Sequence, residues 1–166
     1  SFYKFCSALV VFICLNQFSD KSSINSYLAA FIADFLRYSL ILQGKKFAFE
    51  TVMSHDSKIK ILDNAINNGY KNYLYFICTE SPKLNIERVK LRVQQGGQNV
   101  PEDKIEERYF RTLSLLKPAV QNTYRSFIWD NSGLQPKLIL EVFEGKSVNF
   151  HADEIPFWVD KYLLKA

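Results

Sequence analysis

Four arginines, two on each side of one flexible turn, are the residues of this chain best suited to chemistry. Arg88 and Arg92 precede the turn at 95–101 and lie one helical turn apart, whereas Arg108 and Arg111 follow it. Guanidinium groups bind phosphate oxygens through forked hydrogen bonds. Two helices that carry such groups toward one gap would form a lid over a phosphorylated ligand. A solvated basic face, paired with neighbouring glutamates, is the competing interpretation, and composition alone favours it.

Two carboxylates stand where predicted strands end. Glu50 closes a short apolar segment at 47–51, and Asp130 closes another at 126–130. Side chains at the carboxyl ends of strands in an α/β protein face the crevice where ligands bind. By position alone, Glu50 is as well explained as a surface residue, and Asp130 either holds loop geometry or lines a nucleotide site. For Asp130 the structural role is the favoured interpretation.

The histidines and cysteines give no sign of a metal site. His55 and His151 are far apart and have no metal-like neighbours, so surface or capping roles are expected. Cys6, Cys14 and Cys78 are odd in number and lack C-x-x-C spacing, which predicts free thiols in a reducing compartment. The apolar run near the start is too short to span a bilayer. We therefore expect a cytoplasmic protein without a membrane partner.

Composition indicates an ordinary globular chain. Its 166 residues are 48% hydrophobic and 23% charged, which argues against disorder and fits a single domain over 1–166. The net charge of +4 suits anionic ligands such as phosphates. That charge is too weak and too scattered to argue for nucleic acid, so no nucleic-acid partner is expected.

The elements that must position these residues alternate along the chain. Strands are expected at 9–15, 47–51, 72–79, 126–130 and 138–143. Helices are expected at 25–43, 54–68, 85–94, 101–118 and 155–164. Such alternation predicts an α/β fold, with a mostly parallel sheet flanked by helices on both faces.

Several short segments resemble the zeta toxin family of P-loop kinases, in the order and spacing of that family. They are 47–55, 68–70, 73–76, 85–89, 92–97, 100–101, 105–109 and 130–132. The similarity covers about 25–145 and is nearest to a stand-alone bacterial branch described as predicted ABC-type ATPases. It implies a nucleotide-kinase-like fold with P-loop topology.

The resemblance also implies an activity and its residues. Zeta toxins transfer the γ-phosphate of ATP, with Mg²⁺, to a hydroxyl of UDP-N-acetylglucosamine, a nucleotide sugar. Glu50 matches the family's strand-end glutamate near the substrate, and Arg88, Arg92 and Arg108 match its catalytic lid arginines. Arg111 shares the basic face and is expected to bind phosphate. An antitoxin-like protein is the implied macromolecular partner.

This chain departs from the family pattern in two ways. It contains no Gly-x-x-x-x-Gly-Lys-[Ser/Thr] motif, so the kinase fold is expected to be N-terminally incomplete, with Ser1 as the hydroxyl that follows the missing lysine and binds Mg²⁺. The family's Asn-x-Asp-Glu pattern, whose aspartate is the proposed base, is replaced here by Asn16-Gln-Phe-Ser19, with Asp20 out of register. The alternative hypothesis is a non-catalytic remnant that binds nucleotides, other anions or a partner protein. If this chain is the entire product, no ATP hydrolysis is expected.

Overall fold

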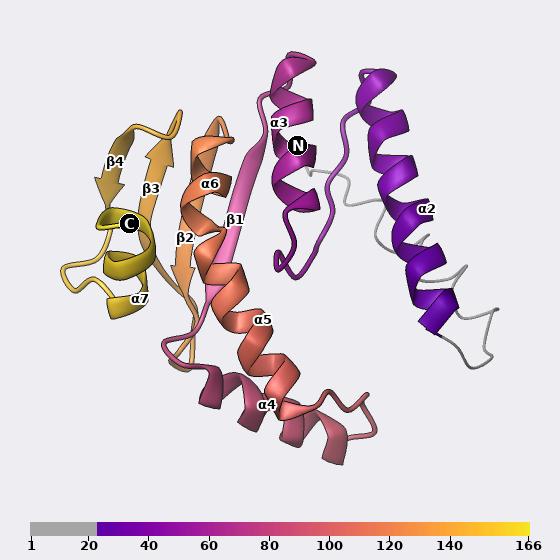
Figure 1. Ribbon diagram of the computed structural model, residues 1–166. Coiled ribbons are helices and arrows are strands. Elements are labelled where there is room, and N and C mark those ends of the chain that lie inside the picture. Colours follow the sequence, from indigo (N-terminus) through magenta and orange to yellow (C-terminus); the bar gives the residue numbers. More distant parts are fainter. Residues whose placement is uncertain (1–22) are drawn as a thin grey trace. The chain divides into compact units, whose positions relative to one another are not determined.

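The computed structural model describes residues 23–166, which form two compact units divided after Thr51 (Figure 1). In the first unit, α2 (Ser23–Leu42) confirms the helix expected at 25–43. Gly44 ends it at φ 65°, where its amide donates to Ile41 O and the amide of Lys45 donates to Leu40 O. The strand expected at 9–15 lies outside the described residues.

The segment after α2 corrects the strand expected at 47–51. The structure forms no strand there, and Glu50 is exposed within an irregular stretch. The rings of Phe47 and Phe49 stack at a centroid distance of 6.1 Å, and the guanidinium of Arg37 lies 4.4 Å above the ring of Phe49. Contacts between side chains within the first unit, rather than a regular strand, therefore organise this apolar segment.

The second unit is built on one four-stranded sheet in the order β1-β2-β3-β4. These strands are β1 (Tyr73–Cys78), β2 (Arg125–Asp130), β3 (Lys137–Phe143) and β4 (Ser147–Phe150). Only β1 and β2 are parallel; β3 is antiparallel to β2, and β4 is antiparallel to β3. The expected mostly parallel, P-loop kinase-like sheet is therefore wrong, because the sheet is mixed.

The short connections explain why the sheet turns antiparallel. Parallel neighbours need a crossover of a dozen or more residues. Only residues 131–136 separate β2 from β3, so a hairpin-like return is the available route. Between β3 and β4, Glu144 and Gly145 both take positive φ, 50° and 65°, in a tight turn closed by a bond from the amide of Lys146 to Phe143 O.

The crossover from β1 to β2 holds three helices. They are α4 (Pro82–Gln94), α5 (Glu102–Ser114) and α6 (Leu116–Gln121). Helix α4 starts at Pro82 in its first turn, earlier than the predicted Asn85, because proline is favoured there. The break expected at Pro118 instead falls at Leu115, and Pro118 lies inside the first turn of α6.

The remaining helices begin and end near their predicted positions. Helix α3 (Ser57–Asn67) starts after His55, whose Nδ1 accepts a 3.2 Å hydrogen bond from the amide of Ser57. The helix expected from residue 54 therefore begins three residues later. Near the C-terminus, α7 (Phe157–Val159) continues as the π-helix η1 (Asp160–Leu164), which confirms a helical segment within 155–164.

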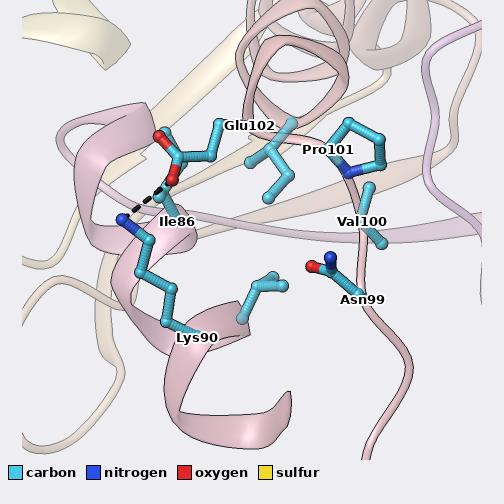
Figure 2. A pocket seen from close by; sticks show the side chains of 8 residues that line it. Ile86, Lys90, Asn99, Val100, Pro101 and Glu102 are labelled. Carbon is cyan, nitrogen blue, oxygen red and sulfur yellow. Dashed lines mark ion pairs between the residues drawn. The ribbon is translucent and has the colours of Figure 1, made fainter.

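Helices α4 and α5 form a hairpin, and the side chains of Lys90 and Glu102 join them through a 2.8 Å ion pair (Figure 2). Both side chains are more than half exposed, so this pair contributes little stability. Helix α4 has no fully buried residue. The hairpin is thus attached to the second unit mainly through α5, where Tyr109 and Leu113 are buried.

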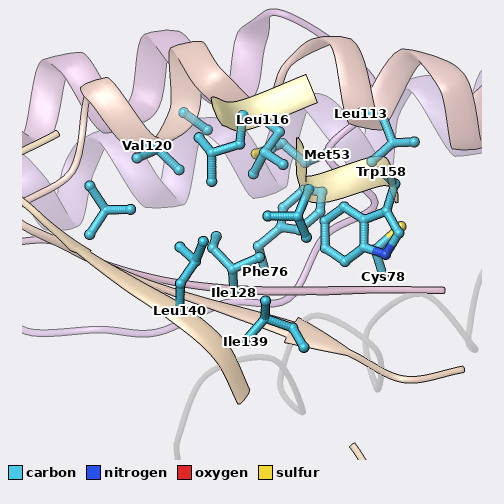
Figure 3. Packing of buried hydrophobic residues seen from close by; sticks show 14 of the residues in the cluster. Met53, Phe76, Cys78, Leu113, Leu116, Val120, Ile128, Ile139, Leu140 and Trp158 are labelled. Atoms are coloured by element: carbon cyan, nitrogen blue, oxygen red, sulfur yellow. The ribbon is translucent and has the colours of Figure 1, made fainter. Parts of the chain in front are cut away.

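One core holds the second unit together, between its helices and one face of the sheet (Figure 3). Its largest member, Trp158, is 1% exposed and lies 5.9 Å, centroid to centroid, from Phe76 of β1. Leu113, Leu116 and Ile128 are almost fully inaccessible. The other face of β1 stays open, since Tyr73, Tyr75 and Ile77 are all more than half exposed.

Candidate functional site

The carboxyl ends of β1 and β2 lie side by side and form the candidate site. Cys78 is in register with Asp130, and the amide of Asn131 donates a 2.7 Å hydrogen bond to Cys78 O. The amide of Glu80 donates to Ser132 Oγ at 2.7 Å. These bonds hold together the two turns that follow the strands. In α/β proteins, this edge of a parallel pair is where ligands bind.

Asp130 organises the turn after β2. Its Oδ1 accepts hydrogen bonds from Ser132 Oγ at 2.9 Å and from Trp158 Nε1 at 3.2 Å. Its Oδ2 accepts a 3.2 Å bond from the amide of Ser132, as in an Asx turn. The carboxylate therefore joins the sheet edge to the C-terminal helix. In this structure, Asp130 holds loop geometry with both oxygens.

One buried hydroxyl of α5, that of Tyr109, supports the turn after β1. The hydroxyl of Tyr109 donates a 2.9 Å hydrogen bond to Thr79 O, and Thr79 Oγ1 donates a 3.0 Å bond to Ser81 O. Burial raises the pKa of Tyr109 above its usual range and raises that of the Cys78 thiol to about 12. Both groups stay protonated near neutral pH, so neither is a nucleophile there.

Arg88 is the predicted lid arginine that reaches the strand ends. Its Nη2 donates a 2.7 Å hydrogen bond to Asn131 O, across the gap between α4 and the turn after β2. A guanidinium has five N–H donors, and this contact uses one. The side chain is exposed, so its other donors face solvent at the candidate site. Arg88 therefore brings a positive charge to the carboxyl end of the parallel pair.

Arg92 and the glycine pair serve to end α4. Gly96, at φ 87°, donates its amide to Val93 O, and Gly97 donates its amide to Arg92 O at 2.9 Å. This is the Schellman pattern of helix termination. A Cβ at Gly97 would lie 2.6 Å from Arg92 Cγ and 2.9 Å from Arg92 O. The two glycines are thus explained by the turn itself.

The α5 arginines lie apart from that contact. Arg111 pairs with Glu107 at 3.4 Å, one helical turn away on the same helix. Arg108 is exposed, and its guanidinium makes no hydrogen bond or ion pair with another described side chain. The structure thus brings Arg88 to the Asp130 turn, but within residues 23–166 no hydrogen bond or ion pair joins Arg92, Arg108 or Arg111 to that turn.

Two predicted site residues are not part of the second unit. Glu50 belongs to the first unit and is exposed in the irregular stretch after α2. Ser1 lies outside the described residues. Sequence reasoning missed the supporting roles of Ser132, Trp158 and Tyr109, although the Asp-Asn-Ser turn was a visible signal for the first. The candidate site therefore rests on the second unit.

The hairpin also contains a pocket of about 340 Å³, on the side of α4 that faces α5 (Figure 2). Aliphatic side chains of Ile86, Val89 and Ile105 line it, and the Lys90–Glu102 ion pair lies at its rim. Neither Arg88 nor Arg92 is among its lining residues. The pocket is therefore separate from the arginine that reaches the strand ends.

Residues 23–166 hold neither a metal-binding cluster nor a helix that could cross a membrane. These residues contain no group of three or more histidine, cysteine, aspartate or glutamate side chains that could hold a metal ion. Within the same range, no helix is long and apolar enough to cross a membrane. A protein kinase or ATPase site commonly takes Mg²⁺ through one or two carboxylates plus the nucleotide phosphates. At the candidate site the carboxylate is that of Asp130, whose oxygens already accept hydrogen bonds from Ser132 and Trp158.

Comparison with known proteins adds one relative and no function. An uncharacterized protein of Haemophilus influenzae is 33% identical over 69 residues, which are 42% of this chain. The match spans 49% of that relative, so it extends over about half of its length. No protein-family profile matches the chain, and no solved structure matches it.

Proposed function

We propose that this chain contributes the phosphate-binding lid of an ATP-dependent phosphotransferase of the zeta toxin type. Its acceptor would be a hydroxyl of a small molecule such as UDP-N-acetylglucosamine. The observation that carries the proposal is the placement of Arg88, whose guanidinium bonds to Asn131 O at 2.7 Å beside the carboxyl ends of β1 and β2. That placement puts a forked cation where α/β proteins bind their ligands.

The chemistry of phosphoryl transfer explains why an arginine is the expected equipment. The bond between the γ-phosphorus of ATP and its bridging oxygen breaks and ADP leaves, while the acceptor oxygen bonds to the γ-phosphorus and loses its proton. Charge spreads over the phosphoryl oxygens in the transition state. Catalysis depends mainly on positioned positive charge. The free donors of Arg88 would take those oxygens, and Arg92, Arg108 and Arg111 would join when the hairpin closes on a nucleotide.

The remaining roles rest on the resemblance alone. Glu50 is the proposed catalytic carboxylate, Ser1 the proposed hydroxyl for Mg²⁺, and Asp130 the proposed support of the nucleotide site. ATP and Mg²⁺ are the proposed cofactors, and an antitoxin-like protein is the proposed partner. A cytoplasmic location would supply ATP and suits the free, buried thiol of Cys78.

A second candidate is anion or nucleotide binding without transfer. It is favoured by the lack of a Gly-x-x-x-x-Gly-Lys-[Ser/Thr] motif within these 166 residues, since that loop cradles the phosphates and supplies a lysine. In that case Arg88 would still bind phosphate, but no γ-phosphoryl group would leave ATP.

Phosphorus NMR distinguishes the two candidates. The product of the complete reading frame is incubated with Mg²⁺, ATP and UDP-N-acetylglucosamine. The phosphotransferase proposal predicts ADP together with a new phosphomonoester, and a loss of at least about a hundredfold in kcat on Arg88→Ala. Lys146→Ala, an exposed cation in the β3–β4 turn, is the matched control and should leave the rate unchanged.

The other outcomes are equally informative. ATP that binds without being consumed would replace the first candidate with the second. Turnover that Arg88→Ala does not slow would remove the lid role from this arginine. An absence of both binding and turnover would contradict both candidates.

A further inference from the structure

The outer edge of β1 is an unpaired strand edge. β1 is at one end of the sheet order, and among residues 23–166 no strand other than β2 pairs with it. Asn72 O and Cys78 O accept hydrogen bonds from backbone amides at the two ends of β2. The backbone N–H and C=O groups of the even-numbered residues therefore face β2. Because backbone groups alternate along a strand, those of Tyr73, Tyr75 and Ile77 face outward.

This edge lacks the features that usually prevent pairing. The strand reads Tyr-Leu-Tyr-Phe-Ile-Cys, with no charge, proline or bulge, whereas natural edges commonly carry at least one of these. The same outward-facing residues have exposed side chains on the open face, at 52% for Tyr73, 63% for Tyr75 and 59% for Ile77. A bare backbone edge and an exposed apolar stripe therefore coincide.

From this edge we infer that β1 pairs antiparallel with β1 of a second copy of the chain, across a twofold axis at Tyr75. Residues directly opposite in an antiparallel pair share a face, so Tyr75 meets Tyr75 of the second copy and Tyr73 meets its Ile77. This register uses the outward backbone groups of Tyr73, Tyr75 and Ile77 together. It also continues the buried face, since Leu74 meets Phe76 of the second copy.

Charges at the two ends of β1 favour the same arrangement. Lys71 precedes the strand and Glu80 follows it, and both are exposed. Antiparallel pairing brings Lys71 to the end of the second strand that carries Glu80, so opposite charges flank an uncharged centre. A parallel neighbour would place like charges together at each end. A closed, self-complementary interface of this kind is the commonest form of homodimer.

A charge exchange at Tyr75 tests the register, because this residue meets only itself. Tyr75→Lys and Tyr75→Glu each place like charges directly opposite one another, and each should raise the dimer dissociation constant by at least about tenfold. An equimolar mixture should form a heterodimer as tightly as the unchanged chain or more tightly. Sedimentation equilibrium of the 166-residue chain measures all of these. Phe150→Lys, on the opposite edge strand and 52% exposed, is the matched control.

Amide hydrogen exchange keeps the test independent of how the variants fold. In the unchanged chain, the amides of Tyr73, Tyr75 and Ile77 should gain protection as concentration rises through the dimer range. A chain that stays monomeric at all concentrations would overturn the inference. So would a mixture no tighter than either variant alone, protection confined to other strands, or equal weakening by Phe150→Lys.

Discussion

Replacing Asp130 by alanine should destabilise the second unit by an amount that its contacts define. The substitution removes the acceptor of Trp158 Nε1, and Trp158 is 1% exposed, so its indole N–H would be left without a partner. An unsatisfied buried donor costs about 1 to 3 kcal/mol. Loss of the two bonds from Ser132 adds about 1 kcal/mol. We therefore expect a loss of about 2 to 4 kcal/mol in the free energy of unfolding.

Urea unfolding followed by far-ultraviolet circular dichroism measures this loss without relying on tryptophan emission. Asp130→Asn keeps the oxygen that accepts from Trp158 and should cost about half as much. Its side-chain NH₂ group would then face the backbone N–H of Ser132, so only that one hydrogen bond is lost. Asp153→Ala, at an exposed loop position, should change stability by no more than about 0.5 kcal/mol. If Asp130→Ala costs no more than Asp153→Ala, the proposed role of Asp130 in holding the turn is incorrect.

Three further predictions concern the same unit. Gly69→Ala should cost about 1 kcal/mol of unfolding free energy from its positive φ alone. Gly145→Ala should cost at least about 1 kcal/mol more, because its Cβ would lie 2.9 Å from Gln121 Cα. Thermal unfolding of the two variants compares these costs. Tyr109→Phe should cost about 1 to 2 kcal/mol in urea unfolding, because Thr79 O would lose its 2.9 Å bond and keep only the weak 3.5 Å bond from Cys78 Sγ. Because the folded pKa of Cys78 is about 12 against 9.0 for a free thiol, its stabilising contribution is complete below pH 9 and falls by about 1.4 kcal/mol per pH unit above it. Cys78→Ala should therefore reduce the loss of unfolding free energy between about pH 9 and pH 10.5. An unchanged slope of unfolding free energy against pH would contradict the raised pKa of Cys78.

Local sequence signals located most elements of the second unit. The apolar run at 72–79 predicted β1, and the helical pattern at 101–118 predicted the helix that is found as α5, with Tyr109 and Leu113 buried. These signals succeed because burial of one face is recorded directly in the spacing of apolar residues. The helix expected at 54–68 was less accurate at its start, since α3 begins only at Ser57.

Strand direction and strand existence were harder to predict. The mixed sheet follows from the short connection at 131–136, which was visible in the sequence but was outweighed by the alternation of elements. The segment at 47–51 has the composition of a strand, yet a strand also needs a neighbour to pair with, and apolar composition does not reveal one. β4 was missed because its residues are exposed and carry no clear burial pattern.

The candidate site was predictable only in its parts. Residue type and spacing identified Arg88 and the Asp-Asn-Ser turn as candidates, but their contact links residues 43 positions apart in the sequence and depends on the crossover that returns β2 beside β1. The support from Trp158 and Tyr109 depends on side-chain packing between elements, which periodicity does not record. Long-range contacts of this kind required the structure.

Titration calorimetry of Mg²⁺–ATP into this chain tests the central claim most directly. If Arg88 binds phosphate at the carboxyl ends of β1 and β2, ATP should bind saturably, and Arg88→Ala should weaken binding by at least about tenfold. Lys146→Ala should leave the affinity unchanged. An absence of binding heat, measured at two temperatures, or equal affinity of the unchanged chain and Arg88→Ala would contradict the claim.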